Sequence, residues 1–447
     1  MTRISSRIRC LCLVVVFSLV GYLIMVHLYS KTSLPLVPGA KIQMPNNHLS
    51  VYGELVEVEE LKNPPFLRDH ATETSTTSLV DEFLDKNSKV RSFFFPERGH
   101  AVDPRKGNEG HYYYPGRIWL DTDGNPIQAH GGGILYDERS RRYYWYGEHK
   151  NGATYRAHGK GVARVDVIGV GCYSSKDLWT WKNEGIVLKA EEKNKTHDLH
   201  KLNVLERPKV IYNDKTGKYI MWMHIDNANY TKASVGIAIS SSPTGPFTYL
   251  YSKSPHGFDS RDMTIFKDGD GMAYLFYSSL HNRQTHIGPL SEDYLDVTNV
   301  MTKVLIGQHR EAHAVFKHRG KYYMITSSCS GWQPNEAMVH VAESIMGQWE
   351  AIGNPCVGAN KVFRVNTFFG QSTFVLPMPG GPPGSFVFMA DRWKPDDLRD
   401  SRYLWLPLIV EEEANQLTLV SPIRSKVSIF WHGKWRIPYK GTHKKSQ

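Results

Sequence analysis

Residues 133–148, GILYDERSRRYYWYGE, carry the pattern that decides the fold: an apolar strand, a short polar turn and an aromatic strand. Short strands separated by Gly, Asp and Asn turns are typical of all-β structure. Four later stretches repeat the pattern: KVIYNDKTGKYIMWMH from Lys209, TIFKDGDGMAYLFYSS from Thr264, AVFKHRGKYYMITSS from Ala314 and STFVLPMPGGPPGSFVFMADRW from Ser372.

The spacing of the five copies predicts a five-bladed β-propeller. Successive copies begin roughly 50 to 75 residues apart, which is enough for a four-stranded blade and its loops. The strands after Arg402, YLWLPLIV and LTLVSPI, are expected either to complete the last blade or to close the ring against the first. We assign residues 111–435 to the propeller.

The charge of the chain does not indicate nucleic-acid binding. The formal net charge is +10, but basic and acidic residues are interspersed, and the basic residues are densest at the two ends. No basic stripe or helix-turn-helix pattern supports a nucleic-acid site. We interpret the charge as a solvated surface, and residues 436–447 as a basic tail.

An apolar run near the N-terminus predicts a membrane anchor. Residues 10–28 are apolar except for His27, and the run is about long enough to cross a bilayer. Arg3, Arg7 and Arg9 precede it, which places the N-terminus in the cytoplasm. A cleavable signal peptide is the alternative, but no small-residue cleavage site follows the run. We assign residues 1–30 to a cytoplasmic tail and transmembrane signal anchor.

Residues 31–110 resemble a stem between anchor and propeller. They mix Pro, short acidic stretches and a Ser/Thr-rich patch, with a short helix expected near SLVDEFLDK. An anchor, a stem and a lumenal domain form the usual layout of Golgi glycan-processing enzymes. We therefore expect a single-pass type II protein of the Golgi, with secretion or the cell surface as the alternative. Two N-glycosylation sequons, at Asn194 and Asn229, agree with a lumenal domain.

Three cysteines fall in the predicted lumenal part: Cys172, Cys329 and Cys356. Their odd number allows at most one intrachain disulfide among them. Cys329 and Cys356 are the nearer pair in sequence, but sequence alone leaves the connectivity open. Because such a chain is no disulfide scaffold, the hydrophobic core must hold the fold together.

One polar residue precedes the first strand of every repeat by three or four positions. The innermost strands of a propeller line its channel, so residues at one repeat position should converge at one end of it. Converging carboxylates shift one another's pKa values apart, as glycoside hydrolysis requires. The alternative is that each is a turn residue, or an ion-pair partner of the flanking Arg207, Arg261 or Arg310. The five residues are His130, Glu206, Asp262, Glu311 and Gln371.

At these motifs the chain resembles glycoside hydrolase family 43, and most closely its exo-β-1,3-galactanase branch. The resemblance covers about residues 112–410, and it implies a five-bladed propeller that cleaves a glycosidic bond with inversion. The motifs that carry it, in chain order, are IQAHGGGILY with YYWYGE, ERPKVIYN with GKYIMWMH, SRDMTIFKD with AYLFYSS, REAHAVFK with GKYYMITS, and GQSTFV.

The resemblance also implies roles for these residues. Glu311 matches the general acid, and Asp262 matches the carboxylate that tunes it. Gln371 matches the glutamine that holds the attacking water or takes a base-like role, and Glu206 matches a glutamate that contacts the sugar. The first-blade aspartate that usually serves as base is missing, because His130 occupies its neighbourhood. His130 could accept a proton or bind the sugar, or it could be structural.

Two tryptophans are further candidates for sugar binding. Trp332 and Trp393 could stack on a sugar ring, or they could be wedges between blades. The sequence shows no zinc-ligand spacing. No cofactor is expected, although a cation bound in the channel stays open.

These patterns predict an inverting hydrolase that releases terminal β-linked galactose from a glycan or proteoglycan. Glu311 would be the acid, and Gln371 would hold the water. The alternative is a catalytically silent glycan-binding propeller, which the missing aspartate would favour.

Overall fold

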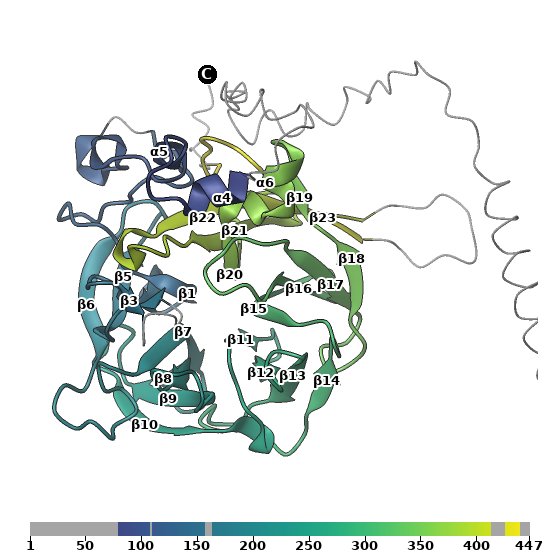
Figure 1. Cartoon of the computed structure of the whole chain (residues 1–447). Coiled ribbons are helices and arrows are strands. Elements are labelled where there is room, and N and C mark those ends of the chain that lie inside the picture. The colour runs from purple at the N-terminus through teal and green to yellow at the C-terminus, as the bar shows by residue number, and fades with distance from the viewer. Residues whose placement is uncertain (1–78, 108–109, 157–162, 413–424, 439–447) are drawn as a thin grey trace, which may run out of the picture. The chain divides into compact units, whose positions relative to one another are not determined.

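Five β-sheets form a ring around a central channel in the computed structural model, as the blades of a propeller do (Figure 1). The structure describes residues 79–107, 110–156, 163–412 and 425–438. The prediction of an all-β, five-bladed propeller is confirmed. The predicted anchor, the predicted stem up to residue 78 and the tail after residue 438 lie outside the described residues. Within the described part, no helix is long and apolar enough to cross a membrane.

The first four blades each contain four antiparallel strands that follow one another in the chain. The first blade holds β1 (His130–Asp137), β2 (Arg142–Glu148), β5 (Gly169–Ser175) and β6 (Lys182–Lys189), with the ribbon β3 (Tyr155–Arg156) and β4 (Ala163–Arg164) between β2 and β5. The second blade holds β7 (Val204–Asn213), β8 (Lys218–Asp226), β9 (Ser234–Ser240) and β10 (Thr248–Lys253). The third holds β11 (Met263–Lys267), β12 (Ala273–Ser279), β13 (Gln284–Pro289) and β14 (Thr302–Val304). The fourth holds β15 (Arg310–His318), β16 (Lys321–Ser328), β17 (Met338–Ala342) and β18 (Glu350–Gly353).

The fifth blade draws strands from two parts of the chain. The short strand β19 (Cys356–Val357) pairs in parallel with the last strand, β23. The YLWLPLIV stretch forms part of β22 and so completes this blade, whereas LTLVSPI lies outside the described residues. The remaining strands are β20 (Gln371–Pro377), β21 (Ser385–Arg392), β22 (Arg402–Glu412) and β23 (Ser425–Phe430).

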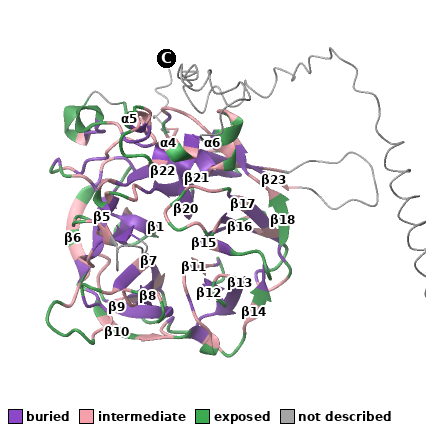
Figure 2. Cartoon of the chain, in the orientation of Figure 1, coloured by how far each residue is buried: buried purple, intermediate pink, exposed green. Residues whose placement is uncertain are grey.

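The aromatic second strands of the repeats form the core between the blades. Their large side chains are almost completely buried, whereas the outer strands β6, β10 and β18 consist mainly of exposed and partly buried residues (Figure 2). Burial of aromatic side chains is the largest favourable contribution that such a fold gains on leaving water. Examples from four blades are Trp145, Trp222, Tyr277 and Tyr323.

Bulges at the start of the inner strands direct the backbone into the channel. The pairing register shifts after His130 in β1, after Glu206 in β7 and after Glu311 in β15. The next residue has a positive φ in each case: 60° at Gly131, 54° at Arg207 and 56° at Ala312. A bulge re-aims the side chains beside it and is common next to binding sites. The site-bearing end of the channel is therefore built from irregular backbone.

The described part of the predicted stem packs on the fifth blade. The expected helix is present as α4 (Leu79–Leu84), followed by α5 (Arg91–Phe94). Phe83 of α4 packs against Phe94 and Phe369, with ring centroids 5.0 and 5.1 Å apart. The other short helices are η1 (Arg98–His100), η2 (Pro104–Lys106), η4 (Pro255–Gly257), α6 (Lys361–Val365), η5 (Thr367–Phe369) and η6 (Leu398–Asp400).

The three described cysteines are free thiols. Cys172 and Cys356 are buried, and Cys329 is exposed. The nearer pair in sequence, Cys329 and Cys356, therefore forms no disulfide, and packing alone holds the described propeller together.

We expect the variant Phe83→Ala to lower the free energy of unfolding by about 3 to 4 kcal/mol, because it removes a buried aromatic ring and leaves a cavity. Urea denaturation of the purified protein would measure the change. Lys86→Ala, an exposed position just after the same helix, should leave the free energy nearly unchanged. Equal stability of both variants would show that α4 does not belong to the folded core.

Candidate active site

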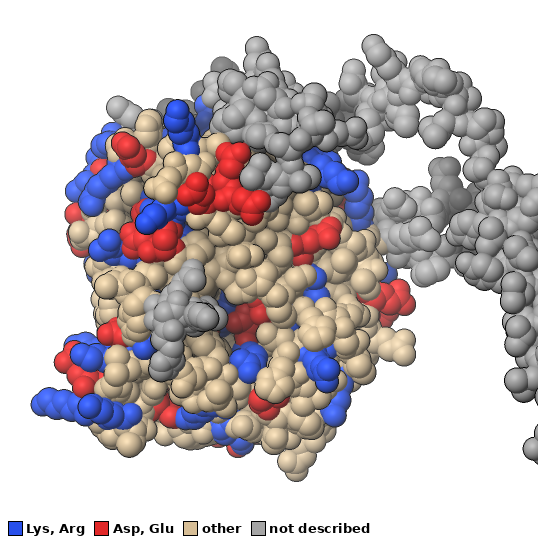
Figure 3. Space-filling model, viewed as in Figure 1, with Lys and Arg blue, Asp and Glu red and all other residues tan. Residues whose placement is uncertain are grey.

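The inner strands begin around a pocket of about 630 Å³ at one end of the channel. Figure 3 shows acidic and basic side chains meeting in the hollow at the centre of this face. Of the seven predicted site residues, six line the pocket and His130 does not. The six are Glu206, Asp262, Glu311, Trp332, Gln371 and Trp393.

The guanidinium group of Arg207 lies at the centre of the site and connects three blades. Its Nη2 is 2.9 Å from Asp262 Oδ2 and donates a hydrogen bond of 2.8 Å to Gln371 Oε1. Its Nη1 donates to the carbonyl of Ser372. Arg207 is only 5% exposed, so these contacts act with little screening by water. The expected ion pair of an arginine next to a site carboxylate thus exists, but across blades.

Four hydrogen bonds hold the side-chain amide of Gln371. Its Oε1 accepts from Arg207 and from the indole Nε1 of Trp393, at 2.8 Å each. Its Nε2 donates to Glu311 Oε1 at 3.1 Å and to Ser327 Oγ at 3.0 Å. An amide oxygen has two acceptor positions and an amide nitrogen two donor positions. The amide is therefore saturated and points its NH₂ group at Glu311.

Glu311 sits in surroundings that favour its neutral form. Burial, and then the negative charge of Asp262, raise the pKa of Glu311 to about 8, although Arg207 opposes the shift. Asn282 lies 3.2 Å from Glu311 Oε2, and its own Oδ1 has no hydrogen-bond partner. Rotation of that amide would give the protonated carboxyl an acceptor. Glu311 is thus arranged to carry a proton at neutral pH.

Glu206 sits in the opposite electrostatic environment. Burial alone would raise the pKa of Glu206, but the hydrogen bond and positive charge of His224 outweigh it and hold the pKa well below its usual range. Tyr230 also donates a 2.8 Å hydrogen bond to Glu206 Oε1. Although burial opposes the shift, hydrogen bonds to Asp226 and Glu206 raise the pKa of His224 to about 9. The pocket thus holds a neutral and an ionised carboxyl group together.

Ligand atoms of Glu206, His224 and Asp262 lie within 4.8 Å of one another, close enough to bind a metal ion. Both ring nitrogens of His224 already contact carboxylates, Nδ1 with Glu206 and Nε2 with Asp226, at 3.2 Å each. A metal ion needs a free imidazole lone pair, so it would have to displace a proton that both carboxylates stabilise. The protonated ring supplies the positive charge that a cation would supply.

Several residues that line the pocket were not predicted from the sequence: Glu148, His224, Tyr230 and Asn282. Glu148 and His224 each end one of the repeats quoted above, and each pairs across the hairpin with a predicted residue, His130 or Glu206. The final position of each repeat was therefore the signal that could have found them. Burial raises the pKa of Glu148, and the Lys150 ammonium, 2.6 Å from Glu148 Oε2, opposes that shift.

His130 does not reach the pocket, so the expected sugar contact or proton transfer by this residue is not supported. Its ring is completely buried, and its Nδ1 lies 2.9 Å from Asp391 Oδ1. The ring also stacks on Tyr403 at 4.8 Å. The imidazole thus faces Asp391 and Tyr403 of the fifth blade instead of the pocket, although β1 carries the same bulge as β7 and β15. His130 has a structural position behind Trp393.

Trp332 and Trp393 stand together on one wall of the pocket. Their rings meet edge to face at 4.8 Å, and the Lys150 ammonium lies 5.2 Å from the Trp332 ring. Trp332 donates to the carbonyl of Ala163 in β4, so it also fastens the fourth blade to the first. Trp393 is 4% exposed and anchors Gln371, whereas Trp332 is half-buried. Trp332 thus offers the larger surface to a ligand.

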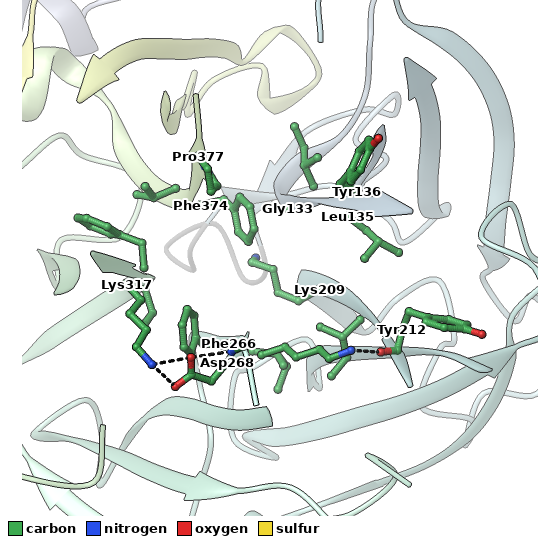
Figure 4. Close-up of a pocket in the computed structure, with 18 of the residues that line it drawn as sticks. Gly133, Leu135, Tyr136, Lys209, Tyr212, Phe266, Asp268, Lys317, Phe374 and Pro377 are labelled. Carbon is green, nitrogen blue, oxygen red and sulfur yellow. Dashed lines mark hydrogen bonds and ion pairs between the residues drawn. The ribbon is translucent and has the colours of Figure 1, made fainter. Parts of the chain in front are cut away.

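A larger cavity, of about 910 Å³, lies at the other end of the inner strands (Figure 4). Three of the carboxylates that line it have partners: Asp268 pairs with Lys317 and accepts from Tyr322, Asp137 accepts from Tyr219, and Asp214 pairs with Lys267. Lys209 separates the two cavities by donating to the carbonyl of Gly131 at 2.7 Å. Because lysine and tyrosine side chains already bind these carboxylates, this cavity is the weaker candidate for an acid–base site.

Comparison with known proteins gives consistent results. The model of the family described as Glycosyl hydrolases family 43 matches residues 125–364. A solved family 43 β-1,3-galactosidase, bound to galactodeoxynojirimycin, is 37% identical over 72% of this chain and 100% of that chain, with a TM-score of 0.64. No curated protein matches.

Two exo-β-1,3-galactanases are also similar. The enzyme from Phanerochaete chrysosporium, solved with galactose, is 37% identical over 66% of this chain and 64% of that chain, with a TM-score of 0.58. The enzyme from Clostridium thermocellum is 33% identical over 73% of this chain and 67% of that chain, with a TM-score of 0.60. The chain thus spans less than two thirds of the Phanerochaete structure.

The raised pKa of Glu311 predicts a pH dependence of stability. The folded protein keeps the proton of Glu311 up to about pH 8, while the unfolded chain releases it above the usual value of 4.5. Unfolding therefore releases a proton between these values, and raising the pH favours unfolding. Relative to Glu311→Gln, wild-type protein should lose stability between about pH 5 and about pH 8. Urea unfolding at several pH values measures this, and parallel curves for the two proteins would contradict it.

Proposed function

Because the chain belongs to glycosyl hydrolase family 43, we propose that it releases galactose from the non-reducing ends of β-1,3-linked galactans, with inversion. The observation that carries the proposal is the pair of carboxyl groups with opposite protonation, Glu311 and Glu206, in one pocket. In a glycosidase, different surroundings shift the pKa values of two carboxyl groups in opposite directions. One group then stays protonated and acts as the acid, while the other stays ionised. The β-1,3-galactosidase and exo-β-1,3-galactanase structures that resemble this chain support the choice of galactose.

In the proposed reaction Glu311 gives its proton to the glycosidic oxygen while water attacks the anomeric carbon from the opposite face. Asp262, fixed by Arg207 and by the backbone N–H of Ala312, keeps the pKa of Glu311 high until the proton leaves. Trp332 offers its face to the C–H surface of the sugar. Glu206, held by Tyr230 and His224, is placed to accept hydrogen bonds from sugar hydroxyl groups.

The water needs a proton acceptor, and Gln371 cannot serve because an amide is not basic near neutral pH. Its four hydrogen bonds also mean that it can hold the water only by exchanging one of them when the sugar binds. We infer that Glu148 accepts the proton. It is a first-blade carboxylate that lines the pocket, and its raised pKa makes it a stronger base than Glu206.

For the lumenal placement we rely on the sequence alone. The apolar run at residues 10–28, preceded by three arginines, supports a type II anchor with the propeller in the lumen of the Golgi. Galactose-bearing glycans and proteoglycans pass through that compartment. Protease protection of the propeller in sealed microsomes would test the orientation.

Glu311→Gln should lower kcat on β-1,3-galactobiose by roughly three orders of magnitude, because proton donation to the leaving oxygen is lost. With a dinitrophenyl β-galactoside, whose leaving group needs no proton, the loss should be much smaller. Glu350→Gln, at an exposed position of β18, is the matched control and should behave as wild type. If wild type binds galactosides but releases no galactose, the chain is a silent glycan-binding propeller.

Glu148→Gln should lower kcat by roughly two to three orders of magnitude on both substrates, since the attacking water must lose its proton whichever group leaves. Glu206→Gln should instead raise KM for both substrates and change kcat little.

Proton NMR of the first product formed by wild type should show α-galactose, the sign of inversion. Recovery of the Glu148 variant with the dinitrophenyl substrate would rule out the base assignment.

A further inference from the structure

One of the two sequons lies at the proposed active site. Asn229-Tyr230-Thr231 forms part of the loop between β8 and β9, and Asn229 is exposed and lines the pocket. The next residue, Tyr230, donates its hydroxyl to Glu206. A modification at Asn229 would therefore begin one residue away from a side chain that binds Glu206.

The loop presents the Asn229 side chain outward. Asn227 organises the turn: its Oδ1 accepts the backbone N–H of Asn229 at 3.0 Å and of Thr231 at 3.1 Å. Its Nδ2 donates to Thr231 Oγ1 at 2.7 Å. Among the described residues, no hydrogen bond engages the side-chain amide of Asn229. The side-chain nitrogen of Asn229, to which a glycan would be attached, is thus available. The hydrogen bonds that shape the loop do not involve it.

We propose that Asn229 carries an N-linked glycan, and that this glycan narrows access to the pocket so that slender, unbranched chain ends are preferred over branched polymers. An N-glycan is bulky and hydrated and extends away from its asparagine. Attached at the rim, it would exclude the side branches of a polymer while leaving room for a single terminal sugar. The inference rests on the proposed function and on the proposed lumenal placement.

The second sequon provides a control within the same chain. Asn194 is also exposed, in the connection between β6 and β7, but it does not line the pocket. Its Oδ1 accepts hydrogen bonds from the backbone N–H and the hydroxyl of Thr196. A glycan at Asn194 should therefore have no effect on substrate size.

The test compares full-length variants made in a eukaryotic secretory host. Thr231→Ala removes the sequon but keeps Asn229, whereas Thr231→Ser keeps both the sequon and the hydroxyl that Asn227 contacts. Asn194→Gln removes the other sequon. Glycopeptide mass spectrometry measures occupancy at each site, and kcat/KM is measured for β-1,3-galactobiose and for a branched β-1,3/1,6-galactan.

We expect Asn229 to be occupied in wild type and in Thr231→Ser, and empty in Thr231→Ala. Thr231→Ala should hydrolyse the branched polymer roughly threefold or more faster, with an unchanged rate on the disaccharide. The other two variants should match wild type on both substrates. An unmodified Asn229 in a chain whose Asn194 is modified overturns the proposal, and so does an unchanged ratio of the two rates. Absence of any galactosidase activity refutes the proposed function instead, since occupancy is read without it.

Discussion

The site depends on one buried cation. Arg207 holds Asp262 and Gln371 with its guanidinium group, and its backbone N–H donates to Glu148 Oε1 at 3.1 Å. Four carboxyl groups share this pocket, and without a central positive charge they would repel one another in a region of low dielectric constant. The positive φ of Arg207 places its backbone and side chain within reach of four blades at once. Its charge binds Asp262 and Gln371 to one another, while burial and the charge of Asp262 raise the pKa of Glu311 against the effect of Arg207. The low pKa of Glu206 has a different cause, the hydrogen bond and positive charge of His224.

Repetition in the sequence made the propeller predictable. A strand, a turn and an aromatic strand recur five times, and the polar residue before each copy has the same place in each blade. The packing of α4 on the fifth blade was not predictable, because Phe83 and Phe94 both contact Phe369, which lies 286 and 275 residues further along the chain. The pairing of β19 with β23 is likewise a long-range contact between short segments with no pattern of their own.

The site was predictable in the four repeats whose polar residue faces the pocket, and not in the first repeat, although its strand carries the same bulge as β7 and β15. Glu206, Asp262, Glu311 and Gln371 follow the common position and meet in the pocket. His130 precedes three glycines, and a side chain at Gly132 would collide with the carbonyl of Tyr146. The partners of His130 are Asp391 and Tyr403 of the fifth blade, far away in the sequence, and no pattern within its own repeat indicates them. Glu148, the cross-strand partner of His130, lines the pocket in its place. A pattern within a single strand does not reveal that the neighbouring strand supplies the carboxylate.

The position of Lys209 has a consequence for turnover. Its side chain fills the channel below the site, and the two cavities share no lining residue. The pocket is thus a blind tunnel, and free galactose must back out through the entrance by which the shortened chain has just withdrawn. Such an enzyme cannot thread its polymer from one cut to the next: every cleavage ends with full dissociation, and accumulated monosaccharide competes with incoming polymer for the same vestibule.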